Sequence, residues 1–328
     1  MKSLMPTSII QKESRFALRF ALIAKSTYSY FSSIPEDLQR EFKNKFNPLH
    51  QEFSNHRAMH HPFFEYLKER AQIGFTPEQY KIYRDNFFRR TELTIPAVAR
   101  FIERAALEGD SHAVVDTIRN LNDEGGYGNV DKMHSNLLLY SHNFHGMRVF
   151  GLDPLHPLSE AKNSLNLVPE VEDYRIAKQK AFEKPYPFVA GNTWAHELAA
   201  DSMLDNFRLV FFAPYQSRYT PEEYQKLTEF FIAHKDDSKE NGDVEAQHGR
   251  MAREVAERAC KLSLSQIAVV RDGGLDFLNH QEKLWDGMLR EIERAQSTGE
   301  LVSANVKPNT SLSEGVSSAF SNVVTRTQ

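Results

Sequence analysis

Two side chains that could bind a metal stand three positions apart, at Glu245 and His248. On a helix this spacing places both on one face, so they can reach one metal ion or two adjacent ions. Carboxylate and imidazole groups both suit non-heme iron. A solvated, charged helix face can contain the same tetrapeptide by chance, and the chain holds no second Glu-x-x-His.

A glycine-rich segment separates a second candidate pair, Glu124 and His134. In one continuous helix these residues would lie about 15 Å apart, too far for a shared metal centre. Gly125, Gly126 and Gly128 lie between them, and each glycine costs roughly 1 kcal/mol inside a helix. We therefore expect the helix to end here and the turn to point Glu124 and His134 at one place. A capping loop with a solvated Glu124 is the alternative.

His234 poses the same problem of distance, because a straight helix would hold it about 21 Å from His248. The intervening segment 235–242 is polar and ends in Asn-Gly, a turn dipeptide. Asp243 can then cap the next helix, which carries Glu245 and His248. The alternative is that His234 caps the C-terminus of its own helix, a position that suits histidine.

Glu197 lies within the apolar segment 194–200, which predicts a buried helix. A carboxylate in such a helix needs a partner or a metal, because burying an isolated charge is costly. An ion pair with an arginine is the alternative to metal binding.

Helices must position all of these side chains. Apolar residues recur at three- and four-residue spacing along most of the chain, without an alternating strand pattern or an internal repeat. The sequence therefore predicts an all-α protein. The expected helices cover residues 13–32, 35–46, 63–71, 77–88, 98–107, 113–122, 130–148, 174–182, 193–212, 221–234, 244–270 and 275–295.

In their order along the chain, the candidate ligands resemble those of the heme-oxygenase-like diiron oxidases. That family binds two irons through three histidines and three carboxylates, and its last three ligands usually stand as His-x-x-x-Asp-x-x-His. Here 13 residues separate His234 from His248, Asn241 stands where a histidine is expected, and either Glu245 or Asp243 supplies the acid. The ligand set that the resemblance implies is Glu124, His134, Glu197, His234, Glu245 and His248.

The resemblance also implies a fold and a domain organisation. It covers about residues 55–290 and includes the motifs at 61–64, 74–78 and 122–125. The implied fold is a heme-oxygenase-like seven-helix bundle with extra N-terminal helices. The expected parts are an N-terminal helical extension packed on the core (1–54), the metal-binding helical domain (55–296) and a flexible C-terminal tail (297–328).

The function that this resemblance implies is a non-heme diiron oxidase or oxygenase. It would hold two Fe²⁺ ions per chain and use O₂ to oxidise a small organic substrate such as an amino acid, an amine or a fatty-acid-like compound. The resemblance leaves open whether the protein needs an external electron donor and whether it forms a homodimer. Two other classes also stay open: a metal-free protein on the same scaffold (a thiaminase-type hydrolase or a cofactorless oxidase) and an all-α interaction protein. The hydrolase would need a nucleophilic cysteine, and Cys260, the sole candidate, is expected in the core.

Composition excludes several other classes. Lys and Arg number 40 against 44 Asp and Glu, so the net charge of −4 does not favour nucleic-acid binding. A single cysteine excludes a disulfide framework within the chain and a Cys-rich metal site. The apolar stretch 16–31 is interrupted by Arg19 and Lys25, which argues against a membrane span. Charged residues around position 12 also argue against a secretion signal, so we expect a cytoplasmic protein.

Overall fold

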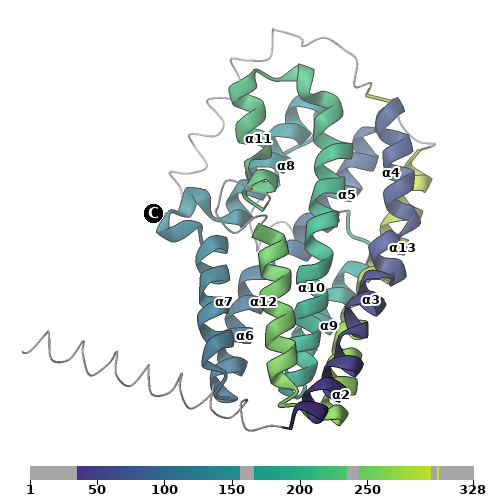
Figure 1. Cartoon of the computed structure of the whole chain (residues 1–328). Helices are drawn as coiled ribbons and strands as arrows, with labels where there is room; N and C mark the ends of the chain where they lie inside the picture. Colours follow the sequence, from purple (N-terminus) through teal and green to yellow (C-terminus); the bar gives the residue numbers. More distant parts are fainter. Residues whose placement is uncertain (1–34, 156–165, 235–243, 297–300, 303–328) are drawn as a thin grey trace, which may run out of the picture.

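Helices form the regular structure of the part of the chain that the computed structural model describes, residues 35–155, 166–234, 244–296 and 301–302 (Figure 1). This confirms the predicted all-α bundle. The α-helices are α2 (Glu36–Phe46), α3 (Pro48–Ser54), α4 (Pro62–Ile73), α5 (Pro77–Thr91), α6 (Thr94–Leu107), α7 (Ser111–Glu124), α8 (His134–Phe150), α9 (Pro169–Ala181), α10 (Tyr186–Phe207), α11 (Pro221–Ala233), α12 (Val244–Ala259) and α13 (Leu264–Ala295).

Both chain ends extend beyond the described ranges. The expected helix 13–32 lies outside them, as does most of the expected tail 297–328. Of that tail, Leu301 and Val302 are described, and Val302 forms an isolated antiparallel bridge with Phe75. Among the described helices, none combines the length and the apolar character that crossing a bilayer requires.

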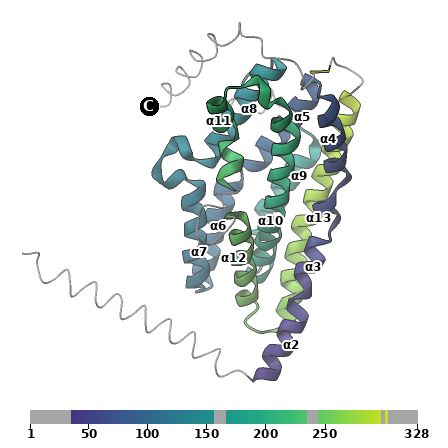
Figure 2. The ribbon, with the colours of Figure 1, turned by 45° about the horizontal axis from the view of Figure 1, so that its top comes forward.

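The helices α2 and α3 pack along α13 (Figure 2). Aromatic side chains also join them to α10. The ring of Trp194 on α10 stacks on Phe46 at a centroid distance of 5.5 Å and meets Phe53 edge-on at 5.0 Å. All three rings are buried. Stacked and edge-on aromatic pairs add to the energy gained from burial alone, so this cluster attaches the N-terminal helices firmly to the bundle.

The predicted boundary between the last two helices is wrong. The sequence predicts helices over 244–270 and 275–295, which leaves residues 271–274, with Gly273 and Gly274, between them. Instead α12 ends earlier, and the chain turns through Lys261 and Leu262, whose φ angles are 47° and 56°. Helix α13 then continues without interruption through Gly273.

Close packing explains why Gly273 does not end a helix. A Cβ atom at Gly273 would lie 2.0 Å from the carbonyl oxygen of Phe188 on α10, and one at Gly191 would lie 2.0 Å from that of Val270 on α13. These glycines allow the two backbones to touch. Glycine therefore marks a helix crossing here, which local periodicity cannot distinguish from a helix end.

Candidate metal centre

Three of the predicted ligands meet where α7, α8 and α11 converge. Glu124 is the last residue of α7, His134 is the first of α8, and His234 directly follows α11. One ligand atom from each residue lies within 4.8 Å of the other two. Glu124 Oε1 is 3.3 Å from His134 Nδ1 and 3.8 Å from His234 Nε2. The histidines are only 8 % and 5 % exposed, so this group could hold a buried metal ion.

The predicted break after α7 is confirmed, and Gly126 shows how it forms the site. Its φ angle is +65°, and a Cβ atom there would lie 2.5 Å from the carbonyl carbon of Lys132. Only glycine allows the two ends of this loop to approach so closely. The loop brings His134, two residues beyond Lys132, beside Glu124.

His234 occupies the C-terminal cap of α11 and also faces Glu124. The two interpretations of this residue, a helix cap and a metal ligand, are therefore compatible. Its Nδ1 lies 2.6 Å from the carbonyl oxygen of Phe230. If Nδ1–H donates this hydrogen bond, the lone pair of Nε2 points toward Glu124. Metal-binding histidines commonly use this arrangement, in which a backbone carbonyl orients the ring.

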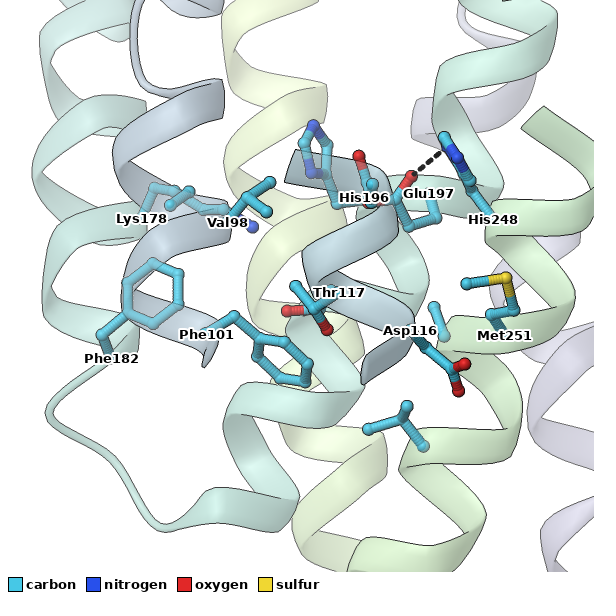
Figure 3. Close-up of a pocket in the computed structure, with 15 residues that line it drawn as sticks. Val98, Phe101, Asp116, Thr117, Lys178, Phe182, His196, Glu197, His248 and Met251 are labelled. Atoms are coloured by element: carbon cyan, nitrogen blue, oxygen red, sulfur yellow. Dashed lines mark hydrogen bonds and ion pairs between the residues drawn. The ribbon is translucent and has the colours of Figure 1, made fainter. Parts of the chain in front are cut away.

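Glu197 and His248 form a second cluster beside the first. His248 Nδ1 lies 4.0 Å from Glu197 Oε2, and the two side chains point toward one another in Figure 3. Asn120 Nδ2 donates to the other oxygen of Glu197 at 3.4 Å. No arginine pairs with Glu197 among the described side chains, so the expected alternative of a Glu–Arg pair is not observed there.

Asp123 joins this second cluster, although sequence reasoning did not select it. Its Oδ2 lies 3.6 Å from His248 Nε2, and Tyr127 donates a hydrogen bond to its Oδ1. The sequence could have indicated Asp123 as a candidate, because it directly precedes Glu124 at the predicted end of a helix. Glu245 lies in the first turn of α12, but its side chain is outside the described part, as are Asp243 and Asn241.

Burial and charge act differently on the two carboxylates that anchor the clusters. Burial alone would raise the pKa of Glu124, but the nearby imidazoles of His134 and His234 outweigh burial and lower the pKa well below its usual value. Burial raises the pKa of Glu197, and attraction from His248 and Lys178 offsets this only in part. A cation beside Glu197 would compensate its buried charge.

Both clusters open onto one cavity. Glu124 and His234 line it from the first cluster, and Glu197 and His248 from the second. The remaining wall is largely apolar, so the cavity offers a water-poor space next to both groups of ligands. The apolar residues include Phe87, Val98, Met203, Leu204 and Phe230.

His134 gives a further indication that these residues could hold a metal. Its Nδ1 is buried and makes no hydrogen bond of acceptable geometry, although Glu124 is near. Buried polar atoms are rarely left in this state without a water, an ion or a functional reason. The donor set of imidazole nitrogens and carboxylate oxygens suits non-heme iron.

Comparison with known proteins gives the fold. No family model and no curated protein matches the chain. Two crystal structures of a CADD-like protein of unknown function from Nostoc punctiforme are similar to it. The 2.00 Å structure has a TM-score of 0.56 and 13 % identity, covering 77 % of this chain and 99 % of that chain. The 1.35 Å structure has a TM-score of 0.55 and 13 % identity, covering 80 % and 99 %. The shared helical fold agrees with the predicted bundle, while membership of the diiron oxidase family stays a prediction.

Proposed function

We propose that the protein is a non-heme diiron enzyme that uses O₂ to oxidise a small organic substrate. The observation that carries this proposal is the buried group of Glu124, His134 and His234, with ligand atoms within 4.8 Å of one another. It supports a metal site because its residue types match iron and it shares a cavity with Glu197 and His248.

In this proposal the two clusters hold one iron each. Glu124, His134 and His234 hold the first, and Glu197, His248 and Asp123 hold the second. The resemblance adds Glu245, whose side chain lies outside the described part. When bound, a ferrous pair supplies electrons and open coordination positions for O₂.

The chain itself orients the ligands and excludes water. The carbonyl of Phe230 orients the ring of His234, and the amide of Asn120 holds one oxygen of Glu197. Apolar side chains limit water around the reacting groups, which strengthens electrostatic interactions and suppresses side reactions. The substrate would enter the cavity that both clusters line.

The cysteine does not support the hydrolase alternative. Cys260 is fully buried, and its thiol donates to the carbonyl oxygen of Ala256 at 3.4 Å. Burial raises the pKa of the thiol to about 12. A nucleophilic cysteine needs an accessible thiolate, which this environment disfavours.

Anaerobic iron titration tests the proposal. We expect about two Fe²⁺ per chain, because two clusters of nitrogen and oxygen ligands are present, followed by an absorbance change when O₂ is mixed in. His134→Ala should reduce iron binding, whereas His112→Ala, at an exposed histidine of α7, should leave it unchanged. Protein that binds no iron, or iron-loaded protein that does not react with O₂, would contradict the proposal.

A further inference from the structure

Lys178 is a buried lysine without a described acidic partner. It lies on α9 and is 6 % exposed. Its Nζ donates to the neutral amide oxygen of Asn192 at 2.9 Å, and it lies 5.1 Å from the ring centroid of Phe277. No described carboxylate forms an ion pair with it. A buried ammonium in this setting has charge left to be compensated.

The cavity next to Lys178 leads to the proposed second iron site. Lys178 lines it together with Glu197 and His248. Figure 3 shows Lys178 and His248 on opposite sides of this space, with Glu197 beside the histidine. A molecule bound between them would therefore contact a cation at one end and metal ligands at the other. Its apolar side chains include Val98, Phe101, Phe182, Met251 and Val255. The wall also carries the carboxylate of Asp116, which lies 3.7 Å from the guanidinium of Arg258.

The other cation of this region is already engaged. The guanidinium of Arg90 donates twice to Gln281 Oε1, at 3.0 and 2.8 Å, and lies over the ring of Tyr174. Arg90 lines the adjoining cavity rather than the one that Lys178 lines. Lys178 is therefore the cationic side chain that the described wall of this cavity presents to a ligand.

We propose that Lys178 binds the anionic group of the substrate, and that the substrate is an apolar monoanion such as a carboxylate. One buried lysine matches one negative charge, and the apolar wall disfavours a second charged group. The apolar body would extend from Lys178 toward Glu197 and His248. This inference rests on the proposed function only in naming the bound molecule a substrate, because anion binding at Lys178 does not require iron.

Protonation of the lysine supports this assignment. Burial lowers the pKa of Lys178 to about 7, against opposing attraction from Glu197 and Asp276. A carboxylate placed on Nζ favours the charged form of the amine and compensates its burial. The site thus gains most from a ligand that carries a single negative charge.

Calorimetric titration of metal-free protein with octanoate and octan-1-ol tests the proposal. The wild type should bind octanoate at least about tenfold more tightly than the alcohol, the effect expected for one hydrogen bond between charged groups. Lys178→Met should lose this preference and retain its affinity for the alcohol. Lys180→Met, at an exposed lysine of the same helix, should bind both as the wild type does. Lys178→Gln serves as a second neutral variant if the methionine variant does not fold.

The proposal is overturned if wild-type protein does not prefer octanoate or if both neutral variants keep the preference. Iron binding, measured on the same preparations, separates this result from the proposed function. Lys178→Met should bind as much iron as the wild type, because Lys178 is not a proposed ligand. Loss of the octanoate preference with normal iron binding supports the anion site, and loss of both assigns Lys178 a structural role and overturns it.

Discussion

Adjacent carboxylates at the end of α7 face different histidines. Glu124 lies against His134 and His234, whereas Asp123 lies 3.6 Å from His248. Successive residues of a helix point in directions about 100° apart. One helix end therefore contributes to both proposed iron sites, and the two carboxylates should have separable effects.

Asp123→Asn should reduce iron binding from about two ions per chain to about one, because the amide removes a negative oxygen beside His248. The first cluster would keep its ligands. Anaerobic titration with Fe²⁺ measures the stoichiometry, and Asp131→Asn, at an exposed carboxylate of the loop that follows α7, provides the control. Asp123→Asn protein that still binds two irons with wild-type affinity would remove Asp123 from the ligand set.

Lys178 should also affect stability in a pH-dependent way. Burial and the neighbouring Arg90 lower its pKa from 10.5 to about 7, while Glu197 and Asp276 act in the opposite direction. Between these two pH values the unfolded chain holds a proton that the folded chain has released. The contribution of Lys178 to stability therefore becomes more favourable as the pH rises through this window.

Lys178→Met removes this titration. The variant should be more stable than the wild type near pH 6, where the buried lysine is charged, and the difference in unfolding free energy should shrink toward pH 10. Urea unfolding of metal-free protein across this range measures the difference. Lys180→Met should follow the pH dependence of the wild type, since that lysine is exposed. If the difference in stability between Lys178→Met and the wild type does not change with pH, the pKa of Lys178 is not lowered in the folded protein.

At the scale of helices, glycine is an ambiguous indicator of where a helix ends. The break after Glu124 was predicted correctly, but the predicted gap at 271–274, which contains Gly273, lies inside α13. Both positions bring backbones together: Gly126 lies against Lys132, and Gly273 against Phe188. Sequence spacing identifies the helices and the residues able to bind metal. It cannot tell which distant backbone approaches a glycine, and it did not reveal that Asp123 turns toward His248.

Gly126→Ala should lower iron binding strongly, because the new Cβ would lie 2.5 Å from the backbone of Lys132 and push the loop apart. Gly128→Ala is the matched control. Its φ angle is also positive, at +82°, but a Cβ there meets nothing within 4 Å. Both variants pay for a left-handed backbone, about 1–2 kcal/mol, so the difference in iron stoichiometry isolates the contact. Equal iron binding would show that loop closure does not set the ligand geometry.

At the scale of the whole molecule, the proposed ligands among the described residues come from α7, α8, α10, α11 and α12 or the residues next to them. A metal bound by side chains from so many helices would connect much of the bundle. Any ligand that binds only the folded state stabilises it, by about 2.7 kcal/mol at a concentration 100 times its dissociation constant.

Anaerobic Fe²⁺ should therefore raise the thermal unfolding temperature. His134→Ala should reduce the increase, because it removes a ligand contributed by α8, and His112→Ala should preserve it. Differential scanning fluorimetry under nitrogen measures both. The same increase in His134→Ala protein would indicate that iron binds elsewhere.

The backbone contact between α10 and α13 has a consequence for how this protein could acquire new substrates. Sliding α10 by one residue would rotate Glu197 by about 100°, and the paired contacts at Gly191 and Gly273 oppose such a slip. The alignment of Glu197 therefore relies on a contact made without side chains. Cavity residues such as Val98 and Phe101 lie on a different helix, α6. Mutations in α6 could therefore change which molecule the cavity accepts while the proposed metal ligands keep their alignment, so the two properties could evolve separately.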